Sequence, residues 1–302
     1  MKTTAKHLTT YGNLGLVQIR VEPETSFSFR PGGPEIKSGG LIISESTGEG
    51  VVGKLTAKNN TDSYLLLADA DVLIGAKQNR VMNKSMLLAP MSETIIDVSC
   101  IERLRWSYTS ERFSNPETVA APDLRQEKAK SLSLRMDLQG DRNPETQRVV
   151  WSHIHDSMNE QGFASMTESY SDLIRFSMEK AGNDFPSCEP EKGCNGIAVL
   201  LDREVVSVDI FGREEVFGYY FPMLRDSAFR MASHGKKVKP VDQPEAYFKV
   251  LDTIDNAEAA QRHADSGYSG AGLFNTLETI NIVGSELTIE QQLVHSAVFA
   301  KK

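Results

Sequence analysis

Between residues 75 and 85 the chain gathers side chains that could hold an anionic, hydroxyl-rich ligand. Lys77 offers a compact charge with three donors, and the planar guanidinium of Arg80 matches the geometry of a phosphate or a carboxylate. Amides and hydroxyls could fix the orientation of such a ligand, and a glycine permits a tight backbone path. An ordinary polar turn contains the same residue types, and spacing alone favours that turn. The candidate ligand-binding residues of this block are Gly75, Lys77, Gln78, Asn79, Arg80, Asn83 and Ser85.

A second group of candidates follows the alternating segment that ends at Cys100. Cys100 could be a nucleophile if a nearby cation lowered its pKa, although a lone cysteine at a strand end is more often a small buried apolar residue. Glu102 is a better candidate for a general base or for an acceptor of ribose hydroxyls, and it could equally pair with Arg80 or Arg105 for structural reasons. Trp106 could stack on a base or a sugar, or could anchor the core. Arg105 and Trp106 therefore join the candidate ligand-binding residues.

No metal site and no cofactor are predicted. His153 and His155 stand two residues apart, and on a helix that spacing points the two rings to different faces. Cys188 and Cys194 lie in an acidic loop without a partner cysteine or histidine at the close spacing of a zinc site. Asp209, an acid inside an apolar strand, is either functional or turned toward solvent.

The composition is that of a large globular protein. A chain of 302 residues with 40% hydrophobic and 25% charged content can bury a core without disulfides or a structural metal. The three cysteines make an odd number, which argues against a secreted disulfide framework. No apolar run is long enough to span a membrane, and Met1–Thr10 lacks the apolar core of a signal peptide, so a cytoplasmic protein is expected. The oligomeric state does not follow from the sequence.

The charge is acidic overall but uneven along the chain. A net charge of −8 argues against a generic nucleic-acid surface, because such binders are usually basic. From Lys77 to Arg135, however, ten lysines and arginines stand against seven acids, a local charge of +3. This basic stretch suits a small anionic ligand better than a long polyanion. A solvated face with internal ion pairs would have the same composition.

The first 115 residues are expected to form strands and show no helical period of useful length. Leu14–Val21 alternates in the manner of a half-buried strand. The turn residues 59–62 predict a hairpin between Val51–Lys58 and Ser63–Ala68. Further strands are expected at Leu41–Ile43, Ser85–Leu88 and Thr94–Val98. The pattern favours a β-sandwich or a strongly bent antiparallel sheet.

Helix-forming residues dominate the middle of the chain, and the last third is mixed. Without a glycine-rich nucleotide-binding motif, this order favours an α+β fold over a doubly wound sheet. One domain with two lobes is expected, a β-rich lobe of residues 1–115 and a helical and mixed lobe of residues 116–302. The expected helices are Asp123–Leu138, Glu145–Met158, Met166–Lys180, Gly212–Met231 and Glu245–His263. The expected strands are Gly196–Leu201 and Val205–Ile210, and Thr279–Val283 and Leu293–Phe299 around a Gly284-Ser285 turn.

These motifs resemble the signature of one family, the ARG (ADP-ribosylglycohydrolase) and rhodanese-phosphatase-superfamily-associated protein domain. The specific part consists of Gly75–Arg80 with Asn83 and Ser85, and of Val98–Glu102 with Arg105 and Trp106. Looser similarity covers Val149–Trp151, Val205–Phe211 with Phe217 and Leu224, and Val294-His295 with Phe299. The resemblance thus spans nearly the whole chain.

The resemblance implies an uncharacterised protein linked to NAD or ADP-ribose metabolism, or to RNA repair. Family members usually carry a glutamate after a small residue before the polar block, whereas this chain has Asp69 and Asp71 there. One of these aspartates therefore replaces the glutamate with a shorter reach. His295 becomes a candidate through its place in the closing strand, although a core histidine is the commoner case. The candidate catalytic residues are Glu102, Asp71, Cys100 and His295.

The function expected from these observations is the binding, and possible hydrolysis, of an anionic nucleotide-type ligand. Lys77 and Arg80 would hold the anion, Glu102 and Asp71 would do acid–base work, and Trp106 would stack on the ligand. Two alternatives remain open at this point. One is a ligand-binding or sensing module without turnover, and the other is a structural, partner-binding protein in which the block is only a rigid turn.

Overall fold

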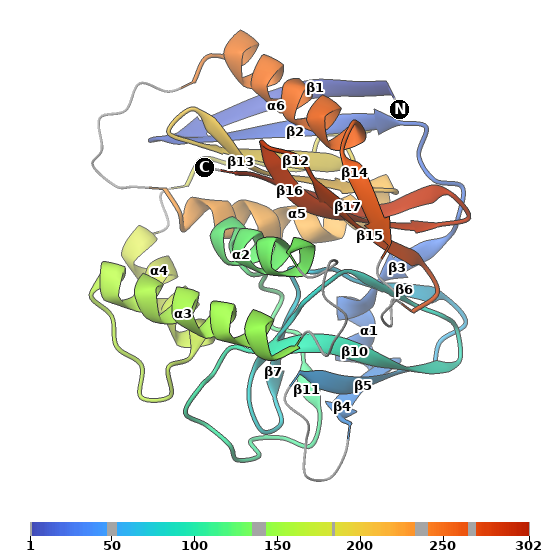
Figure 1. The fold of residues 1–302 in the computed structure, drawn as a ribbon, viewed down its shortest axis with the longest axis vertical. Coiled ribbons are helices and arrows are strands. Elements are labelled where there is room, and N and C mark those ends of the chain that lie inside the picture. The colour runs from blue at the N-terminus through green and yellow to red at the C-terminus, as the bar shows by residue number, and fades with distance from the viewer. Residues whose placement is uncertain are drawn as a thin grey trace.

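The computed structural model describes residues 2–46, 53–134, 143–182, 185–232, 241–264 and 270–301. Within these residues the chain forms six helices and seventeen strands (Figure 1). Strands dominate the N-terminal half, helices the middle, and both types occur in the C-terminal part. The predicted α+β class is therefore confirmed.

An eight-stranded antiparallel sheet joins the two ends of the chain. Its order is β1-β2-β12-β13-β17-β16-β15-β14, so β1 and β2 lie in the same sheet as the last strands. The predicted hairpin at residues 196–210 is confirmed as β12 paired with β13. The strands are β1 (Lys2–Tyr11), β2 (Leu14–Glu22), β12 (Gly196–Leu201), β13 (Glu204–Phe211), β14 (Gln261–Ala264), β15 (Leu273–Glu278), β16 (Ile282–Ile289) and β17 (Gln292–Ala300).

Two smaller sheets carry the rest of the strands. The order of the six-stranded sheet is β11-β7-β8-β10-β5-β4, and that of the three-stranded sheet is β3-β6-β9. Their strands are β3 (Phe29–Pro31), β4 (Leu41–Glu45), β5 (Lys54–Asn59), β6 (Tyr64–Leu67), β7 (Val72–Gly75), β8 (Arg80–Met82), β9 (Met86–Leu88), β10 (Ser92–Cys100) and β11 (Phe113–Ser114). All of their pairings are antiparallel except β3 with β6.

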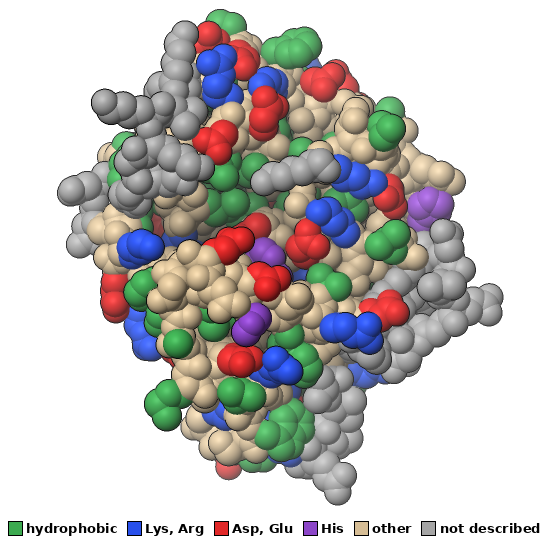
Figure 2. Space-filling model, turned by 60° about the vertical axis from the view of Figure 1, so that its left-hand side comes forward, with side chains coloured by type: hydrophobic (Ala, Val, Ile, Leu, Met, Phe, Trp, Pro, Cys, Tyr) green, Lys and Arg blue, Asp and Glu red, His purple; other side chains and the backbone are tan. Residues whose placement is uncertain are grey.

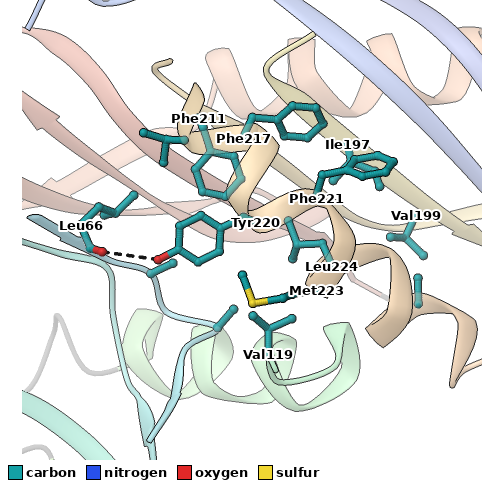
Figure 3. Close-up of a cluster of buried hydrophobic side chains, with 14 of the residues drawn as sticks. Leu66, Val119, Ile197, Val199, Phe211, Phe217, Tyr220, Phe221, Met223 and Leu224 are labelled. Carbon is teal, nitrogen blue, oxygen red and sulfur yellow. Dashed lines mark hydrogen bonds between the residues drawn. The ribbon is translucent and has the colours of Figure 1, made fainter. Parts of the chain in front are cut away.

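Helices α5 (Glu214–Phe229) and α6 (Gln243–Glu258) cover opposite faces of the large sheet (Figure 1). Side chains alternate between the two faces of a strand, so Leu16 of β2 packs in the cluster that contains α5, and Val17 packs in the cluster that contains α6. Figure 3 shows α5 directing aromatic side chains, among them Phe217 and Tyr220, into the core. This core also holds Leu66, so it joins the large sheet to the smaller sheets.

The remaining helices are α1 (Gly32–Ser38), α2 (Pro122–Ser133), α3 (Asn143–Gln161) and α4 (Tyr170–Ala181). Helix α2 lies against both parts of the molecule. Leu124 packs with Val72 and Val81 of the six-stranded sheet, and Ala129 packs with Phe299 of the large sheet. Polar side chains of α2 are therefore held between the sheets.

The structure corrects the predicted N-terminal elements in two places. Residues 32–38 form a short helix, where only strands and loops were expected. The predicted hairpin of Val51–Lys58 with Ser63–Ala68 is wrong, because β5 pairs with β4 and β10 while β6 pairs with β3 and β9. Asn59 explains the difference, because its amide bonds the carbonyls of Ser63 and Ala89 and closes a loop instead of a two-stranded turn. Residues 51 and 52 of that prediction lie outside the described part.

Two predicted C-terminal boundaries are also wrong. Helix α6 ends at Glu258, and residues 261–264 form the edge strand β14. The turn expected at Gly284-Ser285 lies instead at Glu290-Gln291, where both residues have positive φ, and Gly284 is inside β16. A side chain at Gly284 would lie 2.4 Å from the Ala297 carbonyl, so this glycine serves close strand packing. The end of the helix expected at residues 123–138 falls on residues 135–138, which lie outside the described part.

The sheets do not follow the predicted lobe boundary at residue 115, because β1 and β2 pair into the large C-terminal sheet. The division into two lobes stays a prediction. In the part of the chain that the structure describes, none of the helices is long and apolar enough to cross a bilayer.

Candidate functional site

The polar block 75–80 forms the turn between β7 and β8. Gly75 has a φ of +121°, a conformation that a glycine adopts without strain, and Ala76 follows in the left-handed region at +42°. The Gly75 amide donates to Asn79 Oδ1 over 3.0 Å, and Gln78 Nε2 donates to the Glu102 carbonyl over 2.8 Å. The block and the segment from residue 100 to 106 are therefore parts of one hydrogen-bonded unit.

Glu102 and Arg105 form the central ion pair of this unit. Arg105 Nη2 lies 2.5 Å from Glu102 Oε2, and the same oxygen accepts the Asn79 amide at 3.2 Å. Burial alone would raise the pKa of Glu102, but the hydrogen bonds from Arg105 and the Asn79 amide and the charge of Arg105 together outweigh burial and lower that pKa below its ordinary value. Arg105 also donates to the Ala76 carbonyl over 2.8 Å. Glu102 is thus an ionised, firmly positioned carboxylate at neutral pH.

A cation lies between two exposed aromatic rings at the outer surface of the unit. The Lys77 ammonium is 5.2 Å from the ring centroid of Trp106 and 5.2 Å from that of Tyr108. Trp106 is 49% exposed and Tyr108 is 53% exposed. Trp106 is therefore not a core anchor. Sequence analysis missed Tyr108, although its spacing of two from Trp106 was the signal that could have identified it.

Arg80 lies inside the fold. It is 0% exposed, and its Nη1 donates to Gln78 Oε1 over 3.2 Å. The nearest carboxylate is that of Glu45, with Oε1 4.0 Å from Nη2, and neither Arg80 Nε nor Glu45 Oε2 has a hydrogen-bond partner among the described residues. A ligand on the molecular surface does not reach this guanidinium. Glu45, absent from the predicted set, supplies its opposite charge.

Cys100 is completely buried at the end of β10. Its backbone exchanges two hydrogen bonds with the side-chain amide of Gln147 on α3, of 2.6 and 2.8 Å. Burial raises the pKa of the Cys100 thiol, although the charge of Arg80 acts against this. The nucleophile hypothesis required a cation near Cys100, and Arg80 is that cation. Its effect on the thiol pKa is smaller than the effect of burial.

The other predicted residues lie in a second cluster, between the large sheet and the smaller sheets. Asp71 comes from the loop between β6 and β7, Asn83 and Ser85 from the segment between β8 and β9, and His295 from β17. All four are at least nine-tenths buried. The predicted site residues thus form two groups. The charged residues of the second group that sequence analysis missed are Arg125 and Lys128. Asp69, the alternative to Asp71, and Asp209 also lie in this group.

Arg125 of α2 is the central cation of this interior cluster. Its guanidinium bonds Asp69 at 2.9 and 3.0 Å and Asp209 at 2.5 and 3.1 Å. Burial alone would raise the pKa values of both aspartates, but the charge and hydrogen bonds of Arg125, together with the other nearby cationic groups, outweigh burial and lower the pKa of Asp69 to about 2. Asp209 therefore faces an interior cation and not solvent.

His295 connects Ser85 with Asp209. Ser85 Oγ lies 2.8 Å from His295 Nδ1, within hydrogen-bond distance, and accepts the Asp69 amide at 3.0 Å. His295 Nε2 is 3.4 Å from Asp209 Oδ1. Ser85, His295 and Asp209 thus lie in a row, all about 1% exposed, although His295 Nε2 makes no hydrogen bond among the described residues.

Asp71 and Lys128 are ionisable groups buried with incomplete charge compensation. Asp71 Oδ2 accepts from Tyr220 and from the Ala68 amide, at 2.8 and 2.9 Å, while Oδ1 has no partner among the described residues. Burial raises the pKa of Asp71 to about 6. Among the described residues Lys128 donates only to the carbonyls of Asp69 and Met82, and burial lowers its pKa to about 7.

Asp69, Asp209 and His295 are the one group among the described residues with metal-ligand spacing, their ligand atoms lying within 4.8 Å of one another. Arg125 already bonds the oxygens of both aspartates, so the guanidinium supplies the positive charge that a metal ion would bring. His153 pairs with Asp123 at 3.4 Å, and Cys188 accepts a hydrogen bond from Thr9. These residues have structural partners of their own.

Comparison with known proteins gives one match, to a family. The model of the ARG and Rhodanese-Phosphatase-superfamily-associated Protein domain matches residues 2–299. No curated protein matches the chain, and no solved structure does. The matched region contains both groups of candidate residues, as well as the eight-stranded sheet that joins the two ends of the chain. The chain therefore belongs to the ARG and Rhodanese-Phosphatase-superfamily-associated Protein domain family.

Proposed function

We propose that this protein binds an anionic nucleotide-type ligand on the surface formed by Lys77, Trp106 and Tyr108. The observation that carries the proposal is the position of the Lys77 ammonium, 5.2 Å from the centroids of both exposed rings. Aromatic rings exposed beside a cation offer a base a stacking partner and a phosphate an opposite charge. The excess of positive charge from residue 77 to residue 135 also favours a negatively charged ligand.

The ion pair of Glu102 with Arg105 would hold this surface in place. Arg105 bonds the carbonyl of Ala76 and Glu102 bonds the amide of Asn79, so the pair fixes the turn that carries Lys77. Arg80 supports the turn from inside, because it bonds Gln78 and is not exposed. In this proposal Lys77 and Trp106 contact the ligand, whereas Arg80 positions the residues that do.

Hydrolysis of the ligand is a separate proposal that rests on Glu102. Its pKa is lowered, so its carboxylate is ionised at neutral pH and could accept a proton from a water or from a ribose hydroxyl. The family name associates its members with ADP-ribosylglycohydrolase, so ADP-ribose and NAD are the first substrates to test, followed by mononucleotides and RNA ends. A sensing module would bind the same ligands without turnover.

Isothermal titration with ADP-ribose, NAD and AMP tests the binding proposal. Trp106→Ala should weaken binding about tenfold, because stacking on one base contributes roughly 1–3 kcal/mol. Lys77→Gln should weaken binding and reduce its salt dependence, because an exposed charge is screened by salt. Lys58→Gln, which removes an exposed lysine from β5, is the matched control. If none of the three ligands binds, or if both variants bind as the control does, the surface is not the site.

Turnover is tested by incubating the protein with any ligand that binds and identifying the products by mass spectrometry. Glu102→Gln should leave binding within a fewfold of the unaltered chain and abolish the product. An unchanged rate in Glu102→Gln would remove Glu102 from the mechanism. Binding without product, in the unaltered chain, would favour the sensing module.

A further inference from the structure

A groove of about 690 Å³ lies far along the chain from the polar block, between α4 and the segment that follows α5. Helix α3 contributes to one wall, and Leu201 of β12 lies opposite. This side of the molecule faces the viewer in Figure 2, where hydrophobic side chains lie at the floor of a hollow with acidic and histidine side chains along its border. None of the predicted site residues lines the groove. Its volume is in the range that accommodates a small molecule.

Arg230 is a cation of this groove whose charge the neighbouring carboxylates of Asp123 and Asp226 compensate only in part. It immediately follows α5 and is partly buried, and its Nη2 donates to the backbone carbonyl of Val119 over 3.0 Å. Among the described residues it forms no ion pair. Burial lowers the pKa of Arg230 from its ordinary value, which reflects a charge withdrawn from water without full compensation. An anion at this guanidinium would supply the missing charge.

The acids of the groove do not cancel this charge. Asp123 is bonded to His153 of α3, with 3.4 Å between Oδ2 and Nε2, and it also accepts the Leu124 amide at 2.8 Å. Burial alone would lower the pKa of His153, but the hydrogen bond and the charge of Asp123, together with the charges of Glu127 and Glu160, outweigh burial and raise that pKa. The charge of Asp123 is therefore directed mainly to His153. Glu160 and Lys180 are exposed residues of opposite charge on the walls. Tyr170, the last titratable group, accepts the Ala121 amide at 3.0 Å.

The rest of the lining is largely apolar. Leu173 and Ile174 of α4 line the groove together with Leu201 and Met231. A second hollow of about 420 Å³ shares Asp123, Leu201 and Met231 and extends the apolar surface along β13. Apolar side chains beside a guanidinium that forms no ion pair among the described residues suit a molecule whose body is apolar and whose charge is at one end.

We propose that this groove binds a small molecule with an apolar body and one anionic group, and that Arg230 holds the anion. The apolar body would lie between α4 and β12, against Leu173, Ile174 and Leu201. The site is independent of the surface of Lys77 and Trp106, because no residue of that surface lines the groove. A carboxylate, a sulfonate or a phosphate monoester fits the same chemistry, and the chain offers no second arginine on this lining for a polyanion.

Two fluorescent probes with the same aromatic body test the proposal on the full chain. 1-Anilinonaphthalene-8-sulfonate carries the anion, and N-phenyl-1-naphthylamine lacks it. The sulfonate should bind at one site and at least tenfold more tightly than the neutral probe. Equal affinity of the two probes would overturn the role assigned to the anion. This comparison needs no variant, so it does not depend on the folding of an altered chain.

Arg230→Met should reduce the affinity for the sulfonate to that of the neutral probe. Arg230→Lys keeps a positive charge, so it should reduce the affinity for the sulfonate by a smaller factor. Arg175→Met is the matched control, because Arg175 lies on α4 with a side chain 71% exposed and outside the groove. Circular dichroism establishes that each variant is folded. The variant Lys77→Gln with Trp106→Ala should bind the sulfonate unchanged. If instead it loses the probe, the nucleotide surface and not the groove is the site, and the proposal fails.

Discussion

Arg125 and Asp209 are joined by two hydrogen bonds, of 2.5 and 3.1 Å, at the centre of the molecule. Arg125 belongs to α2 and Asp209 to β13 of the large sheet, while Asp69 accepts the remaining arms of the guanidinium from the loop before β7. One side chain therefore connects a helix, the large sheet and a loop of the smaller sheets. All three residues are at least nine-tenths buried, so solvent does not screen their charges.

Removing the cation should destabilise the whole fold. Arg125→Met leaves two buried carboxylates without a partner, and breaking a buried ion pair from one side costs roughly 3–5 kcal/mol. Urea denaturation should show this loss in the free energy of unfolding. The exposed Arg175→Met serves as a control and should cost less than about 1 kcal/mol. A loss below 1 kcal/mol for Arg125→Met would mean that the cluster relaxes or that another cation replaces the guanidinium.

Asp71→Asn should remove a pH dependence of stability. The carboxyl pKa is about 6 in the folded state and 3.8 as its ordinary value, so between these pH values the folded state binds more protons than the unfolded state. The stabilisation of the folded state by protonated Asp71 is fully present below pH 3.8, the ordinary pKa, and is lost as pH rises through 6. The advantage of Asn over Asp should therefore grow by roughly 1.4 kcal/mol between pH 5 and pH 8.

Chemical denaturation of both chains at the two pH values measures this difference. Other titrating groups, Lys128 among them, are common to both chains and cancel in the comparison. Asparagine can keep the bonds to Tyr220 and to the Ala68 amide, because its carbonyl oxygen is an acceptor. A constant difference between the chains from pH 5 to pH 8 would show that Asp71 is not protonated near pH 6.

Gly75→Ala should strain the turn that carries the proposed binding surface. A Cβ at this position would lie 2.4 Å from Ser110 Oγ and 2.9 Å from the Arg112 carbonyl, at a φ of +121°. We expect a loss of roughly 1–3 kcal/mol in stability and weaker nucleotide binding. Gly162→Ala separates the two causes, because Gly162 also has positive φ but has no atom near its Cβ position. Equal losses of stability in the two variants would show that the positive φ causes the whole effect, and that the contacts of the new Cβ with Ser110 and Arg112 cause none of it.

The three cysteines should be unreactive in the folded protein. Cys100, Cys188 and Cys194 are all free thiols, all buried, and burial raises the pKa of each. Titration with Ellman's reagent should give less than one fast-reacting thiol in the native protein and three after denaturation. Rapid modification of Cys100, identified by peptide mass mapping, would restore it as a candidate nucleophile.

Local patterns predicted the fold class and much of the chain's secondary structure. The hairpin at residues 196–210 followed from two apolar runs around a polar turn, because strand alternation and turn chemistry are local properties. The partner of a strand is not a local property. The turn residues 59–62 indicated a hairpin, but β5 pairs with β4 and β10, and β6 with β3 and β9. A turn signal does not specify which distant strands are available as partners.

For the candidate site, the sequence by itself determined which residues carry chemistry, and the tertiary structure decided which of them meet. Residue types and the resemblance marked the segments 75–85 and 100–106 and the terminal His295, since charge, amide and hydroxyl groups are visible in a sequence. Burial is not visible there. The fold turns Lys77 and Trp106 outward and encloses Arg80. It buries Asp71, Ser85 and His295 in a cluster whose central cation, Arg125 of α2, no sequence motif marked. The physical reason is that an interior charge must find its partner within a few ångströms, and only the packing of distant elements supplies one.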